Sequence, residues 1–255
     1  MIKCGFPKMK EVLALVEKRK QEFAQLPFFK FLQDKSIDPS QRLAWAPFLA
    51  SFAMNFADLN QYVLRKEPAT SKIQEIINKH TYEDDQHWEW FLQDLEKLQL
   101  NPSLKFTEAL RFVWSEESWK IRQICHQIAL HIFNADPLVV LAAVEAIEAT
   151  GNVALSLTAK VAEELEQMTK QEYHYFGHFH FCVETGHTMG TDDMEQFIES
   201  IQLTEETRKQ AFEVVEKVFE AFTEGVIELM AISEKLLYEQ SFIETSWVEQ
   251  HRLAA

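Results

Sequence analysis

The chain has 255 residues, of which 47% are hydrophobic and 25% are charged. This balance is typical of a globular protein and excludes a mainly disordered or fibrous one. The formal net charge of −15 repels phosphate backbones and anionic headgroups, so we expect neither nucleic acid nor a membrane as a partner. Three dispersed cysteines give no disulfide framework, and no signal-peptide pattern is present, so we expect a cytoplasmic protein.

The positions of glycine and proline in the sequence predict an all-α protein. The 6 glycines and 7 prolines fall mostly where an amphipathic pattern with helical period breaks. No low-complexity linker and no long repeat divides the chain, so we expect one helical domain over residues 1–255. The breaks lie near residues 27, 36–39, 67–68, 101–103, 135–137, 186–193 and 204.

Three of these helices have specific sequence signals. Pro47 interrupts the periodic segment 41–65, so we expect a kink there. Asp136 followed by Pro137 predicts a helix start, because the Asp caps the helix and proline is tolerated at its first position. A last long helix is expected from Glu205 to about residue 240.

Potential metal ligands first gather between residues 80 and 87. Glu83 and His87 are four residues apart, which on one helix brings both side chains within reach of a common point. His80, Asp84 and His87 repeat this geometry with spacing 0, 4, 7. We therefore predict that a carboxylate from Glu83 or Asp84 acts with His87, whereas Asp85 is better interpreted as part of an acidic surface turn.

A second candidate lies in the apolar run from 138 to 149. Glu145 and Glu148 are its charged residues. A carboxylate on an apolar helix is costly to bury unless it is paired or binds a metal. One of these two glutamates is therefore a candidate bridging ligand.

The third cluster is His180, Glu184 and His187. On a helix, the 0, 4, 7 spacing puts the three side chains within roughly 40–60° of one face. Two neutral imidazoles and a carboxylate suit iron, manganese or zinc. Aromatic residues flank the cluster, so its face is not expected to be fully solvated.

Together, the three clusters resemble the haem-oxygenase-like di-iron oxidases and oxygenases, a superfamily that includes the CADD-like proteins. Their pattern is a Glu with a downstream His, a Glu on a central helix, and then His-x3-Asp/Glu-x2-His. The run from His180 to His187 carries the third motif, and Glu83 with His87 is the closest fit to the first. For the central helix Glu148 is favoured because small residues follow it, and Glu145 stays open.

The resemblance implies a haem-oxygenase-like multi-helix bundle, a homodimer and a cofactor of two Fe(II) ions. Iron with manganese, or a single iron, are alternatives. It also implies a non-haem oxidoreductase, an oxidase or oxygenase that uses O2 and an electron donor to oxidise a small organic substrate. The implied ligands are Glu83, His87 and Glu148 for one ion and His180, Glu184 and His187 for the other, with His80, Asp84 and Glu145 as competitors.

Two other functions remain open at this point. A metal-free helical protein of this fold could bind a small molecule without chemistry. A cofactor-independent oxidase of the related PqqC type would consume oxygen in the presence of chelators. Metal binding therefore distinguishes the main prediction from both alternatives.

Overall fold

The computed structural model describes residues 7–185 and 192–252, and it confirms the prediction of an all-α bundle. Within those ranges no strand forms, and Lys8 and Gln202 make an isolated β-bridge. The N-terminal half contains α1 (Met9–Phe23), α2 (Pro27–Gln33), α3 (Pro39–Arg42), η1 (Ala46–Leu49), α4 (Ala50–Asp58), η2 (Leu59–Leu64), α5 (Lys72–Asp84), α6 (His87–Lys97), α7 (Phe106–Val113), η3 (Glu116–Ser118) and α8 (Trp119–Ile132). The C-terminal half contains α9 (Pro137–Thr169), α10 (His178–Thr185), α11 (Asp192–Ser200) and α12 (Glu205–Arg252).

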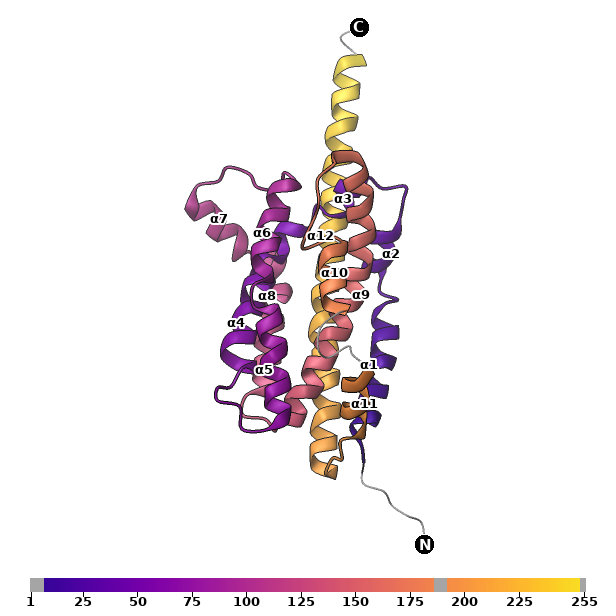
Figure 1. Cartoon of the computed structure of the whole chain (residues 1–255). Coiled ribbons are helices and arrows are strands. Elements are labelled where there is room, and N and C mark those ends of the chain that lie inside the picture. The colour runs from indigo at the N-terminus through magenta and orange to yellow at the C-terminus, as the bar shows by residue number, and fades with distance from the viewer. Residues whose placement is uncertain (1–6, 186–191, 253–255) are drawn as a thin grey trace.

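The two longest helices, α9 and α12, form the centre of an elongated bundle (Figure 1). In this view α1, α2 and α11 lie on one side of them, and α4, α5, α6 and α8 lie on the other. Helix α12 packs against α8, α9 and α1, and its C-terminal end extends past the rest of the bundle. The buried apolar side chains form one continuous hydrophobic cluster across these helices.

Helix α9 begins as its sequence predicts. The Asp136 carboxylate accepts a hydrogen bond from the Leu138 N–H (2.8 Å), and Pro137 occupies the first helical position. The helix ends at Thr169, and its C-cap residue, Lys170, adopts a left-handed conformation (φ 61°). Among the described helices, α9 is the one long and apolar enough to cross a membrane, with a mean hydropathy of 1.7, but 61% of that apolar window is buried inside the bundle. Burial of this kind is typical of a central core helix.

The segment around Pro47 is more irregular than a kinked helix. Pro47 lies in the 3-10 helix η1, which separates α3 from α4, and α4 continues into the π-helix η2. The missing N–H of proline explains why an α-helix does not run through this point. At the other end of the chain, α12 runs to Arg252, beyond the expected end near residue 240.

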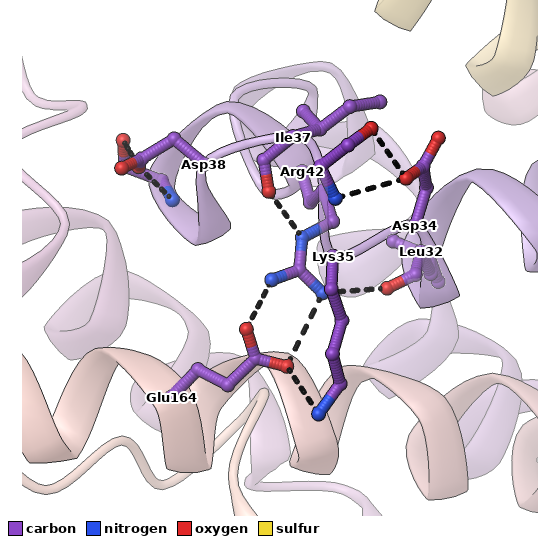
Figure 2. Close-up of polar contacts among 9 residues, drawn as sticks. Leu32, Asp34, Lys35, Ile37, Asp38, Arg42 and Glu164 are labelled. Carbon is purple, nitrogen blue, oxygen red and sulfur yellow. Dashed lines mark hydrogen bonds and ion pairs between the residues drawn. The ribbon is translucent and has the colours of Figure 1, made fainter.

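A buried arginine ties the N-terminal turn to the central helix (Figure 2). Arg42 is 1% exposed and forms an ion pair with Glu164 of α9, and Lys35 approaches the same carboxylate from the surface. The remaining Arg42 donors bind the carbonyls of Leu32 (2.9 Å) and Ile37 (3.0 Å). A buried guanidinium needs such a complete set of acceptors, because an unpaired buried charge is very costly.

Candidate metal centre

A buried group of ligand-type side chains lies between α5 and α9. The His80 Nε2 atom is 3.1 Å from Asp84 Oδ2, one turn further along α5, and 3.4 Å from Glu148 Oε1 on α9. His80 is 1% and Asp84 2% exposed, whereas Glu148 is half-buried. The three residues offer one nitrogen and two carboxylate oxygens, all within 4.8 Å of one another.

This donor set fits a divalent metal ion. With bonds of about 2.1 Å, two neighbouring ligand atoms on one metal lie about 3.0–3.4 Å apart. The separations from His80 Nε2 to the two carboxylates, 3.1 and 3.4 Å, match this range. Two carboxylates with one imidazole also concentrate negative charge in a buried place, which a cation would neutralise. In helix bundles, such sites are built from side chains on facing helices.

A pair of histidines contributes a second part of the centre. His180 on α10 directs Nδ1 to the Tyr175 carbonyl (2.9 Å), and its Nε2 lies 3.0 Å from His87 Nδ1. A carbonyl only accepts, so His180 Nδ1 donates to it, and Nε2 of a ring with this single proton accepts a hydrogen bond from His87 Nδ1. A backbone carbonyl bound to the distal ring nitrogen is the usual support of a metal-ligating histidine.

Aromatic rings surround this histidine pair. Trp90 stacks on the His87 ring with 4.3 Å between centroids, and it meets the His180 ring edge-on at 5.5 Å. The Tyr175 ring lies 5.1 Å from the His180 ring, measured between centroids. His87 and His180 are each 5% exposed as a result. These rings restrict the orientation of both imidazoles and limit the access of water.

The segment that leads into α10 is held by a buried aspartate. Asp94 of α6 is 0% exposed, and its carboxylate accepts the backbone N–H groups of His174 (2.9 Å), Tyr175 (2.8 Å) and Phe176 (3.0 Å). Successive N–H groups of this kind form a concave anion-binding arrangement. Asp94 therefore fixes the Tyr175 carbonyl, and through it the orientation of His180.

The residue that follows, Gly177, is required by a close backbone approach. A Cβ atom at this position would lie 1.9 Å from the Tyr173 carbonyl oxygen. No side chain fits there without a shift of the backbone. Glycine thus allows the chain to turn tightly between the segment held by Asp94 and the start of α10 at His178.

The turn between α5 and α6 is also fixed by buried charge. Arg65 binds the Asp85 carboxylate (2.6 Å) and the Thr81 carbonyl (2.8 Å) at the C-terminal end of α5. Asp85 is therefore buried and ion-paired, and its interpretation as part of an acidic surface turn is wrong. The paired arginine explains the difference, since a carboxylate with a guanidinium partner tolerates burial.

The centre opens on an apolar cavity of about 150 Å³. Asp84, His87, Glu148 and His180 line it. The rest of the wall is mainly aromatic and aliphatic, and includes Phe28, Phe52, Phe176, Phe222, Ile124 and Val226. A concave apolar site with a few convergent polar groups is typical of small-molecule binding.

The structure brings together part of the ligand set predicted from sequence. His80, Asp84 and Glu148 form one group, and His87 contacts His180. Glu83 and Glu145 are half-buried and are not members of the group of three. The pairing of Glu83 with His87 assumes that both residues lie on one helix. In the structure, α5 ends at Asp84 and α6 begins at His87.

Two predicted ligands are not tested by these contacts. Glu184 belongs to α10, but its side chain lies outside the described residues, as does the whole of His187. Their roles stay predictions. Sequence reasoning also missed Asp94 and the Tyr175 carbonyl, which position His180. A lone acidic residue in an amphipathic helix and a backbone carbonyl give no signal in the sequence.

The sequence matches no protein-family profile, and a search of curated protein sequences finds no similar protein.

Proposed function

We propose that the chain is a non-haem metal oxidoreductase that binds two iron ions, or iron with manganese, and uses O2 to oxidise a small organic substrate. The observation that carries the proposal is the group of His80, Asp84 and Glu148, of which Asp84 and Glu148 line the same apolar cavity as the His87–His180 pair. The resemblance of the sequence motifs to haem-oxygenase-like di-iron enzymes supports iron as the metal. An electron donor and a homodimeric state belong to the same proposal.

In this function the residues divide into two sets of ligands. His80, Asp84 and Glu148 would hold one ion, and His87 and His180 would contribute to the other together with Glu184 and His187. Bound iron supplies the activation of dioxygen, which side chains alone do not perform.

The chain itself orients the ligands and excludes water. The Tyr175 carbonyl holds the proton of His180 at Nδ1, so Nε2 would be the ligand atom once its hydrogen bond with His87 is replaced by a metal. Trp90 packs on His87 and keeps that ring in place. The apolar wall of the cavity then brings a hydrocarbon part of the substrate next to Asp84 and Glu148.

The proposal is tested by metal content after anaerobic loading with Fe(II), followed by the optical spectrum and oxygen consumption on exposure to air. We expect about two irons per chain and an oxygen-dependent absorption change. His80→Ala and Asp84→Ala should each lose at least one iron and the oxygen-dependent signal. The matched control is His131→Ala, the same substitution at an exposed histidine of α8, which should load iron like the wild type.

Three results would contradict the proposal. A folded wild-type protein without stoichiometric iron would leave the metal-free binding protein as the better function. Oxygen consumption that persists in the presence of a chelator would favour a cofactor-independent oxidase instead. Equal iron loading in His80→Ala and His131→Ala would reject the group of three as ligands.

A further inference from the structure

The cavity beside the metal centre has a size and a wall chemistry that restrict what it can hold. Its volume of about 150 Å³ equals that of engineered protein cavities that stay dry and bind benzene or xenon. The wall is built mainly by aromatic rings, among them Phe52 and Phe222, whose centroids lie 5.6 Å apart. A compact apolar group therefore fits this space better than a long or hydrated one.

The charged side chains of the wall disfavour an anion in the metal-free protein. Among the described residues that line the cavity there is no lysine or arginine, and the charged ones are the carboxylates of Asp84 and Glu148. The hydroxyls of the two lining threonines are engaged within α9, because Thr150 donates to the Ile147 carbonyl (2.7 Å) and Thr158 to the Leu155 carbonyl (3.3 Å). An anionic group would meet the repulsion of these two carboxylates and no lysine or arginine to offset it.

Gly151 creates part of this space. It lies in the interior of α9, three residues after Glu148, and it lines the cavity. Glycine inside a helix is unfavourable relative to alanine, yet no contact demands it here, because a Cβ at this position would meet nothing within 4 Å. The other lining glycine, Gly225 of α12, differs: a Cβ there would lie 2.7 Å from Ile124 Cδ1. Gly225 serves packing, whereas the absent side chain of Gly151 leaves open volume.

We infer that the cavity accepts an uncharged, compact hydrocarbon group of the substrate, about the size of a benzene ring, and that Gly151 sets its size limit. This inference rests on the proposed function for its chemical meaning, because the oxidised substrate would carry that group. The binding of the group itself depends on the apolar wall and not on the metal.

The test is calorimetric titration of the full-length, metal-free protein with benzene, p-xylene and benzoate. Wild type should bind benzene, and should bind benzoate at least about tenfold more weakly, because the added carboxylate is desolvated next to Asp84 and Glu148 with no lysine or arginine in the wall. Gly151→Leu should weaken benzene binding about tenfold or more by filling the cavity. The matched control is Asn152→Leu, the neighbouring position of α9, which does not line the cavity and should bind benzene like the wild type.

A second variant keeps the test decisive if Gly151→Leu does not fold. Gly151→Ala adds one methyl group to open space, so it should stay folded and weaken p-xylene binding more than benzene binding. The inference is overturned if wild type does not bind benzene, if benzoate binds as tightly as benzene, or if folded Gly151 variants bind all probes like the wild type. Equal losses in Gly151→Leu and Asn152→Leu would also overturn the role of Gly151.

The experiments can reject the cavity inference and the proposed oxidoreductase function independently of each other. Iron loading with no benzene binding would reject the cavity inference and leave the metal centre. Benzene binding without iron loading would reject the oxidoreductase and leave an apolar-ligand-binding site.

Discussion

Replacing Asp94 with alanine tests whether one buried carboxylate organises the approach to the metal centre. The change removes the acceptor of three backbone N–H groups, those of His174, Tyr175 and Phe176, at 2.8–3.0 Å. Hydrogen bonds to a charged group contribute about 1.5–3 kcal/mol each, and breaking a buried charged network costs roughly 3–5 kcal/mol. Because such contributions are not additive, we expect a loss of about 4 kcal/mol in the free energy of unfolding.

Urea denaturation followed by circular dichroism measures this loss. A decrease of about 4 kcal/mol corresponds to a midpoint lower by about 1 M or more in urea, and to a melting temperature lower by roughly 10 °C. Glu96→Ala is the matched control, since it removes one acidic side chain from an exposed position of the same helix and should change stability by less than about 0.5 kcal/mol. Equal midpoints for Asp94→Ala and Glu96→Ala would refute the anchoring role of Asp94.

Two further substitutions have defined outcomes. Gly177→Ala should lower the melting temperature and weaken iron loading, because its Cβ would lie 1.9 Å from the Tyr173 carbonyl oxygen; wild-type values for both would contradict the close approach. Burial raises the pKa of Glu228, although the N–H groups of Lys120 and Ile121 at the start of α8 donate to its carboxylate and oppose the shift. The folded state then retains this proton more strongly than the unfolded state, so the residue's contribution to stability falls as pH rises from the ordinary glutamate range through the raised pKa. The glutamine of Glu228→Gln cannot ionise, so the urea midpoint of this variant minus that of wild type should be larger at pH 7 than at pH 4.5. An equal difference at the two pH values would show that Glu228 does not titrate as described.

The sequence was sufficient to predict the fold class and the start of the central helix, because both depend on local signals. Asp136 and Pro137 act within one turn, and the structure shows the predicted cap. The region around Pro47 could be predicted only in part. Proline excludes a regular α-helix, but whether the chain continues as a kinked helix or as a 3-10 helix depends on its packing against neighbouring helices.

Assignment of the metal ligands depended on a helix boundary that the sequence does not define. Counting Glu83 and His87 as one turn apart assumes a single helix, but the chain turns between Asp84 and His87, where Arg65 binds the Asp85 carboxylate. A break of this kind rotates every later side chain relative to the earlier ones, so residue spacing predicts shared faces on each side of the break and makes no prediction across it. His80 and Asp84 lie on the same side, and their 0, 4 spacing does bring them together.

The position of His180 shows why motif residues alone do not define a site. Its imidazole is oriented by the carbonyl of Tyr175, the Tyr175 segment is held by Asp94 from another helix, and Gly177 permits the turn between them. These supports are a backbone atom, a single buried acid and an absent side chain, none of which forms a recognisable pattern with the histidine. An experiment can distinguish the two kinds of residue. Loss of a ligand such as His80 should remove at least one iron from a stable protein, whereas loss of Asp94 should reduce stability and metal affinity together, since it acts on the metal only through the fold.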